Sequence, residues 1–165
     1  MPKALPGPLS LRPVREGDLP LLYEMQLDEE ARRLAAFVSE ETRDGAAFVA
    51  KHRKILADPA ITFRGVEVAG ELVGSAAVFP IEQDIELAYW VRRDLWGRGV
   101  ATAAVAALLK EVTARPVHAR VVADNPGSVR VLERNGFVRI GSEDSYADGR
   151  GATVTELVLR LDDPR

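Results

Sequence analysis

The stretch Ile85-Glu-Leu-Ala-Tyr-Trp-Val-Arg-Arg-Asp-Leu-Trp-Gly-Arg-Gly-Val-Ala101 contains the transition that decides the fold. Its first seven residues are mostly apolar and predict a strand over 85–91. Glycines at 97 and 99 then predict a tight turn, and a helix rich in small residues follows from Val100 to about residue 113. The first N–H groups of that helix have no partner within it, so the turn is suited to bind an anion.

The segment Trp96-Gly97-Arg98-Gly99-Val100-Ala101 is therefore interpreted as a phosphate cradle, with Arg98 adding positive charge. A Gly-x-Gly turn between a strand and a helix also occurs with no ligand, and the pattern alone does not separate the two readings. Two other nucleotide motifs are excluded. The sequence has no Walker-type Gly-x-x-x-x-Gly-Lys-Ser/Thr loop, and Thr102 stands where a Rossmann loop needs its third glycine.

The remaining elements alternate between helices and strands around this unit. Before this unit, the sequence predicts a Pro-rich tail (1–8), a strand (9–14), a helix that starts after Asp18 as its N-cap, an ambiguous segment (28–39), a helix (40–57) and a hairpin (61–68 and 72–79). After it, the sequence predicts a strand (117–123), a helix that begins at Asn125-Pro126 and ends at Asn135-Gly136, and a final hairpin (137–146 and 152–161). Strand–helix–strand units in the second half predict some parallel pairing, and the hairpins predict that the rest is antiparallel. The sequence therefore predicts a mixed α/β sheet.

Composition excludes several classes of function. A length of 165 residues favours one domain, and a net charge of −3 does not support a nucleic-acid-binding surface. The absence of cysteine excludes disulfides and thiol nucleophiles. No apolar run approaches the roughly 20 residues that span a bilayer, so we expect a cytoplasmic protein with no membrane partner. His52 and His118 are isolated, which predicts no metal site.

Three segments together resemble the GNAT acetyltransferase superfamily, and most of all its branch that acetylates ribosomal-protein N-termini. In its pattern Gln/Arg-x-x-Gly-x-Gly/Ala, Trp96 takes the first position and Gly99 and Ala101 take the others. The run 125–137 resembles the second CoA-side motif, and 11–18 fits the first strand and turn. The resemblance covers nearly the whole chain. It implies one domain over 9–162 with the GNAT acyl-CoA N-acyltransferase fold, a mostly antiparallel central sheet flanked by helices on both faces.

The same resemblance implies acetyl-CoA as the acyl donor, without a metal. In this fold the strand around 89–91 separates from its neighbour, and its backbone pairs with the pantetheine arm. The start of the helix at 125–128 lies near the pantetheine and the sulfur. The implied donor-binding residues are Tyr89, Trp90, Val91, Trp96, Gly97, Arg98, Gly99, Val100, Ala101, Thr102, Asn125 and Ser128.

The catalytic candidates are Glu86 and Ser128. An attacking amine must lose a proton, and Glu86 is the expected base, although a solvent-facing charge on a strand is the alternative. Leu132 occupies the position at which many family members have a tyrosine acid, so Ser128 is the expected donor to the departing thiolate. The alternative for Ser128 is a structural role, in which its hydroxyl bonds only to the backbone. Tyr146 is a more distant candidate, and a thiolate with a pKa near ~8.5 can also leave without an acid.

We therefore expect transfer of acetyl from acetyl-CoA to a primary amine of a small molecule or a peptide or protein N-terminus, by direct attack. A catalytically inactive acyl-CoA-binding module that acts through a partner and an enzyme that uses a different acyl group are the alternatives. Residues 20–60 and 140–152, which shape the acceptor site in the family, carry no decisive signature. Homodimers are common in the family, so the resemblance also implies a homodimer as one possible assembly.

Overall fold

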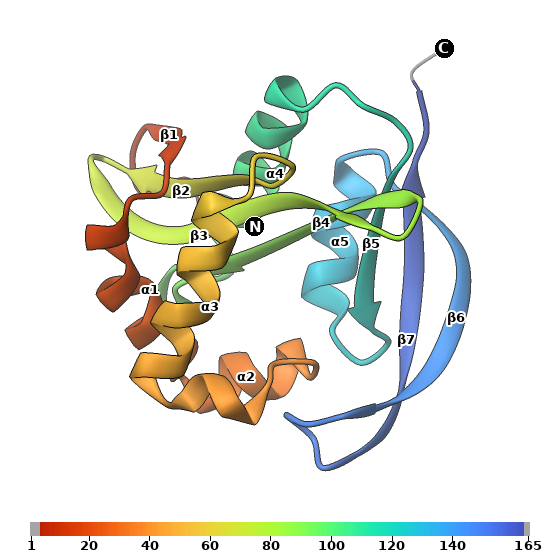
Figure 1. Ribbon diagram of the computed structural model, residues 1–165. Helices are drawn as coiled ribbons and strands as arrows, with labels where there is room; N and C mark the ends of the chain where they lie inside the picture. The colour runs from red at the N-terminus through yellow and green to blue at the C-terminus, as the bar shows by residue number, and fades with distance from the viewer. Residues whose placement is uncertain (1–3, 164–165) are drawn as a thin grey trace.

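The computed structural model describes residues 4–163. In chain order the elements are β1 Leu9–Pro13, α1 Leu19–Gln26, α2 Glu29–Ala35, α3 Gly45–Ala57, β2 Thr62–Val68, β3 Glu71–Ile81, β4 Asp84–Val91, α4 Val100–Glu111, β5 Val117–Val122, α5 Pro126–Arg134, β6 Val138–Ala147 and β7 Ala152–Leu161 (Figure 1). Part of the predicted N-terminal tail, residues 1–3, lies outside the described residues. Residues 4–8 contain no helix or strand, and Pro8 O accepts a hydrogen bond from Ala69 N.

One seven-stranded sheet organises the fold, with the order β1-β2-β3-β4-β5-β7-β6. All neighbouring strands are antiparallel except β4 and β5, which are parallel and connected by α4. Both predicted hairpins, β2–β3 and β6–β7, are present. The prediction of a mixed α/β sheet with mostly antiparallel pairing is confirmed.

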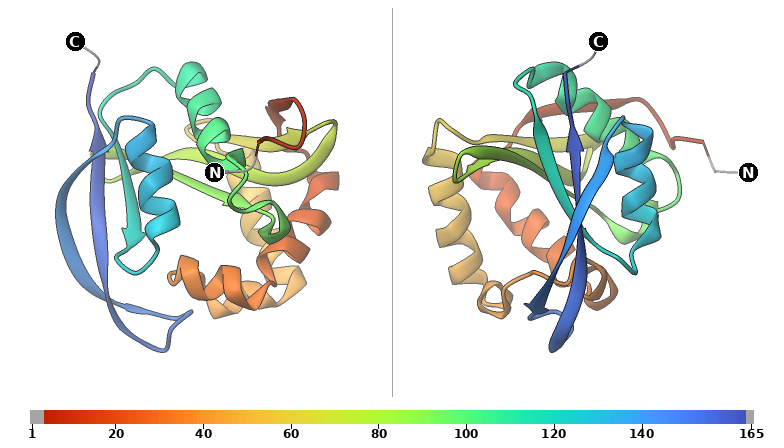
Figure 2. Two further views of the ribbon diagram at one scale, coloured as in Figure 1. Left: turned by 180° about the vertical axis from the view of Figure 1, so that it is seen from behind. Right: turned by 90° about the vertical axis from the view of Figure 1, so that its right-hand side faces the viewer.

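Helices pack on both faces of this sheet (Figure 2). Helices α4 and α5 bury Val105, Leu108 and Leu132 against one face, which we call the α4 face. Helices α1 and α3 bury apolar side chains such as Leu22 and Phe48 against the other face, which we call the α3 face. Because successive side chains of a strand point to opposite faces, β4 contributes Leu87 to the α4 face and Trp90 to the α3 face. Each face of β4 therefore carries its own set of side chains.

The predicted helix over 40–57 is wrong in its first part. Residues Glu40–Arg43 form a 3₁₀ turn, and α3 begins only at Gly45. Asp44 separates them because its backbone is extended and its carboxylate accepts from Ala47 N at 2.9 Å, as an N-cap does. The ambiguous segment 28–39 contains α2, which Asp28 caps in the same way through Ala31 N.

Asp18 occupies the predicted N-cap position of α1, but its carboxylate makes no side-chain cap bond to that helix. It accepts instead from Arg15 N at 2.7 Å and from the Arg12 guanidinium, which lowers the pKa of Asp18. The caps of α5 are as predicted, since Asn125 Oδ1 accepts from Ser128 N and Gly136 after the helix has φ +90°.

Gly74 in β3 marks a close approach of two strands. A Cβ built there would lie 2.1 Å from Trp90 O of β4, closer than any real contact. We expect Gly74→Ala to lower the free energy of unfolding by about 2–3 kcal/mol, because the strands must move apart. Gly141→Ala in β6 is the control, since its Cβ meets nothing within 4 Å and should cost less than about 0.5 kcal/mol. Urea unfolding compares them, and equal stabilities would contradict the predicted constraint.

Candidate functional site

Strands β4 and β5 separate almost as soon as they pair. Within residues 4–163 their parallel pairing is confined to Glu86 and His118. Strand β4 remains paired with β3 as far as Val91, and β5 remains paired with β7 along its length. The backbone edges of β4 and β5 that face each other beyond this point therefore lack a strand partner, and an extended ligand can supply one. We call this opening the splay.

The glycine turn predicted between β4 and α4 is present beside the splay. Gly97 and Gly99 have φ of +76° and +80°, a left-handed conformation that other residues adopt at a cost. Gly99 is the N-cap of α4 and provides no side-chain cap, so the first N–H groups of that helix remain available to an anion. Arg98 Nε is buried without a hydrogen-bond partner among the described residues. These features fit a phosphate group.

Other predicted donor-binding residues around this turn have structural roles. Trp96 is 39% exposed, and its indole N–H donates to Val91 O at 2.8 Å, which ties the turn to the end of β4. The side chains of Val91 and Val100 are buried in the core, so a ligand can meet only their backbone groups, of which Val91 O already accepts from Trp96. Ala101 and Thr102 are half-buried in the first turn of α4, and Thr102 O accepts from Asn135.

On the α4 face, two predicted residues from different elements meet. The Tyr89 hydroxyl of β4 and the Ser128 hydroxyl of α5 are hydrogen-bonded. Burial raises the pKa of Tyr89 to about 12, although the hydrogen bond to Ser128 acts in the opposite direction. Leu132 is 1% exposed and belongs to the core. The side chain of Asn125 holds the start of α5 through Ser128 N and reaches Leu34 O.

On the α3 face, Glu86 is not isolated. Arg120 of β5 donates to Glu86 at 2.8 Å and to Glu143 of β6 at 2.8 Å, and it lies 3.6 Å from Glu156 of β7. Burial raises the pKa of Glu156, against the lowering effect of Arg120. Arg120 thus lies closer to Glu86, at 2.8 Å, than to Glu156, at 3.6 Å. Trp90 lies on the same face, and its indole nitrogen is buried without a partner among the described residues.

Arg120 and Glu156 were not among the residues predicted from the sequence. Both stand on strands at positions that alternate with core residues, such as Ala119 and Leu157. A charged residue between core residues of a strand is a signal in the sequence that could have identified each of them. This signal does not reveal which charged residues meet across strands. The register between β4, β5 and β7 determines that.

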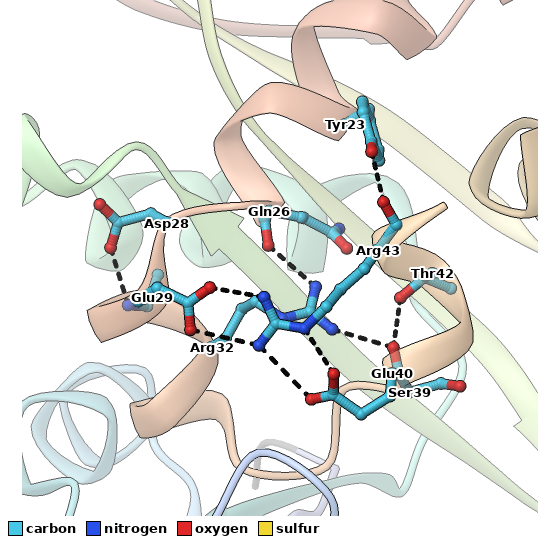
Figure 3. Close-up of polar contacts among 10 residues, drawn as sticks. Tyr23, Gln26, Asp28, Glu29, Arg32, Ser39, Glu40, Thr42 and Arg43 are labelled. Carbon is cyan, nitrogen blue, oxygen red and sulfur yellow. Dashed lines mark hydrogen bonds and ion pairs between the residues drawn. The ribbon is translucent and has the colours of Figure 1, made fainter. Parts of the chain in front are cut away.

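A buried arginine organises the segment between α1 and α3 (Figure 3). Arg32 of α2 is 1% exposed, and its guanidinium donates to Gln26 O at 3.0 Å and Ser39 O at 2.9 Å. Burial, and then the nearby Arg43, lowers the pKa of Arg32. Arg43 itself pairs with Glu29 and Glu40. Carbonyl groups from both sides of the segment therefore bond the two terminal nitrogens of the buried guanidinium and fix the segment beside the sheet.

The tip of the β6–β7 hairpin binds the C-terminal end of α2, and we call this contact the clasp. Gly149 N donates to Ala36 O at 2.8 Å, and Arg150 Nε donates to Arg33 O at 2.5 Å. Arg150 also pairs with Asp124, which follows β5. The last carbonyls of a helix have no partner within it, so the hairpin supplies the donors that α2 needs. The clasp joins the α2 segment to the strands beyond the splay.

Within residues 4–163, no cluster of three acidic or histidine side chains has an arrangement that could hold a metal ion. Over the same range, no helix combines the length and apolar character needed to cross a bilayer. His52 is buried, and its Nδ1 contacts Phe48 O at 2.8 Å. Burial lowers the pKa of His52 and favours its neutral form.

The family described as an acetyltransferase (GNAT) domain matches residues 9–138. No curated protein matches the sequence. Solved structures with a similar fold include RimJ of Mycobacterium smegmatis in complex with CoA-disulfide, which is 23% identical with a TM-score of 0.80 over 97% of this chain and 84% of that one. The ribosomal-protein-alanine N-acetyltransferase of Brucella melitensis is 21% identical, with a TM-score of 0.79 over 93% and 99%. The spermidine N-acetyltransferase of Vibrio cholerae in complex with CoA and spermine is 21% identical, with a TM-score of 0.76 over 93% and 95%.

The clasp can be opened by one methyl group. A Cβ on Gly149 would lie 2.7 Å from Arg32 O and 2.9 Å from Ala36 O. We expect Gly149→Ala to increase amide hydrogen exchange in α2 and at the hairpin tip by about tenfold or more, because the backbone contact must break. Exchange in α4 should not change. Gly141→Ala in the same hairpin is the control, and unchanged exchange in α2 of the Gly149 variant would contradict the predicted clasp.

Proposed function

Because the chain belongs to the GNAT acetyltransferase family, we propose that it transfers the acetyl group of acetyl-CoA to a primary amine. The observation that carries this proposal is the glycine turn beside the splay of β4 and β5. One domain over residues 9–162 performs the reaction. The chain contains no cysteine for a thioester intermediate, which supports direct attack of the amine on the thioester.

The α4 face and the splay receive the donor. The pyrophosphate of CoA binds at Trp96–Ala101, where unpaired N–H groups of α4 and the charge of Arg98 offset its negative charge. The amides of the pantetheine arm pair with the backbone of Tyr89–Val91, which faces the splay. Asn125 and Ser128 then lie at the thioester end, because Ser128 contacts Tyr89.

The carboxylates on the α3 face prepare the amine. An alkyl ammonium must lose a proton before its nitrogen can attack, and Glu86 accepts that proton directly or through water. Arg120 holds Glu86 at 2.8 Å, which orients the carboxylate. Burial raises the pKa of Glu156. Glu156 is the second candidate for the role of proton acceptor. The released thiolate accepts a hydrogen bond from Ser128.

The acceptor is a primary amine of a small molecule or of a peptide or protein N-terminus. Glu86 and Glu156, the two less exposed carboxylates, lie beside one arginine, Arg120, and the excess of negative charge attracts an ammonium group. Names of similar structures include acetyltransferases of ribosomal proteins and of spermidine, which supports both kinds of amine. An assay of CoA release with a panel of polyamines, amino acids and peptides tests this proposal, and no release with any member would contradict it.

We also propose a cytoplasmic homodimer. The absence of cysteine suits a reducing compartment. Strand β6 is an edge strand of the sheet, and Val138, Ile140 and Tyr146 are exposed on it, which supports pairing with a second copy. Sedimentation velocity tests the assembly, and a monomer at micromolar concentration would remove this part of the proposal.

Two glycines with the same backbone conformation allow an effect on donor binding to be distinguished from an effect on stability. Gly99 has φ +80° at the start of α4, and Gly70 has φ +81° in the β2–β3 turn. We expect Gly99→Ala and Gly70→Ala each to cost about 1–2 kcal/mol of stability through strain. Calorimetric titration with acetyl-CoA should show at least about tenfold weaker binding for Gly99→Ala alone, because the cradle N–H groups are displaced.

The wild-type protein in that titration tests the proposed function itself. Saturable binding of acetyl-CoA supports it, and no binding at micromolar protein would refute it. Equal losses of affinity in the two glycine variants would show that the turn at 97–99 does not hold the donor.

The proton acceptor can be identified from pH profiles. We expect Glu86→Gln to lower kcat/KM by about 10²-fold at neutral pH and to recover at high pH, where the free amine is already neutral. Glu143→Gln is the matched control, because it also removes an Arg120 ion pair, and we expect a change of less than about threefold. An unchanged profile for Glu86→Gln together with a loss in Glu156→Gln would transfer the role to Glu156. Its raised pKa then predicts loss of activity as the pH falls through that value.

A further inference from the structure

Two hydroxyl groups bridge the splay on the α4 face. Tyr89 stands on β4, three residues beyond the last paired residue, Glu86. Ser128 is the third residue of α5, and its hydroxyl and that of Tyr89 share a hydrogen bond. The bond therefore connects the two sides of the splay at the place where a thioester must lie under the proposed function.

We propose that Tyr89 is a positioning residue whose O–H donates to Ser128 Oγ and thereby directs the Ser128 hydrogen toward the sulfur of the bound thioester. The proposal rests on the proposed function, because it requires CoA as the leaving group. It assigns to Tyr89 a side-chain role in addition to any backbone contact with the donor.

The chemistry of the two hydroxyls favours this direction. Each hydroxyl has one hydrogen to donate, and each can also accept. A phenol is more acidic than an aliphatic alcohol, so Tyr89 is the better donor and Ser128 the better acceptor. Accepting from Tyr89 leaves the Ser128 hydrogen free and polarises it. The Ser128 N–H is already used by Asn125 Oδ1, so Asn125 holds the backbone without competing for the hydroxyl.

Tyr89 does not itself protonate the leaving group. Burial raises the pKa of Tyr89 to about 12, whereas a thiol ionises near ~8.5. Proton transfer from Tyr89 to the thiolate is therefore unfavourable. When the C–S bond breaks, its electron pair therefore stays on sulfur, and the thiolate accepts a hydrogen bond from Ser128 near the positive end of α5. The proton lost by the amine passes to the α3-face carboxylate and then to solvent.

A double-mutant cycle tests the positioning role. Wild type, Tyr89→Phe, Ser128→Ala and the double variant are compared for kcat, for KM of acetyl-CoA, and for the pKa of the thiol of bound CoA measured by thiolate absorbance. We expect Tyr89→Phe to lower kcat about tenfold with KM within about twofold. The double variant should be no slower than Ser128→Ala within about twofold, because Tyr89 acts through Ser128. The bound thiol should ionise about one pKa unit higher in Tyr89→Phe than in wild type.

Tyr23→Phe is the matched control, because it removes a tyrosine hydrogen bond to Arg43 O in a different part of the molecule and should leave the bound-thiol pKa unchanged. Losses of kcat that add up in the double variant, or a wild-type thiol pKa in Tyr89→Phe, would overturn the positioning role. The proposed function would stand in that case as long as the protein binds CoA. The thiol pKa decides the question even if no tested amine is acetylated. Wild type that does not bind CoA would overturn both proposals.

Discussion

Backbone groups in the middle of a sheet normally bond to a strand on each side. In the described part of the chain, β4 and β5 pair with each other only at Glu86 and His118. Beyond this pair, β3 and β7 hold the outer edges of the two strands, while the inner edges face each other without pairing. Leaving such groups buried and unbonded is costly. The sheet therefore tolerates this gap where water or an extended ligand can enter it. The positions of the glycine turn, α5 and the carboxylates follow from this gap.

Contacts on both faces keep the two halves of the sheet together despite the gap. On the α3 face, Arg120 of β5 bonds Glu86 of β4, and on the α4 face Ser128 bonds Tyr89. The clasp joins α2 to the β6–β7 hairpin. Under the proposed function, donor and acceptor then approach one strand from opposite faces. Negative charge of the donor lies near the start of α4, and the ammonium group lies near the carboxylates, so the two do not compete for one set of charges.

Most of the fold could be predicted from local pattern. Alternation of apolar residues, the Asn125-Pro126 helix start and the left-handed glycines at 97, 99 and 136 each act within a few residues, and these elements are where the sequence predicted them. The failure at 40–57 is also local in origin, because Asp44 is of a residue type that favours the N-cap over the helix interior, and this start signal was not used. Its carboxylate accepts from Ala47 N, and α3 begins at Gly45. Asp18 stands at the predicted N-cap position but makes no side-chain cap, because Arg12, six residues earlier, binds its carboxylate.

The candidate site could be predicted only in part. The glycine turn is contiguous in sequence, whereas Glu86, Arg120 and Glu156 meet through the register of three strands. Arg32 resembles any surface arginine in a helix, and its burial depends on carbonyl groups from two other segments. Side-chain pairs of this kind are invisible until the topology is known.

The clasp has a consequence for the order in which the protein becomes complete during synthesis. Arg150 and Arg33 are separated by 117 positions, whereas β4, the glycine turn and α4 form from one contiguous stretch. Contacts between distant positions close later than local ones, since the intervening chain must first be ordered, and the N-terminal part of a chain leaves the ribosome first. The C-terminal end of α2 therefore receives the hydrogen bonds of the clasp only when the final hairpin has emerged. A nascent chain can form its glycine turn well before the clasp closes.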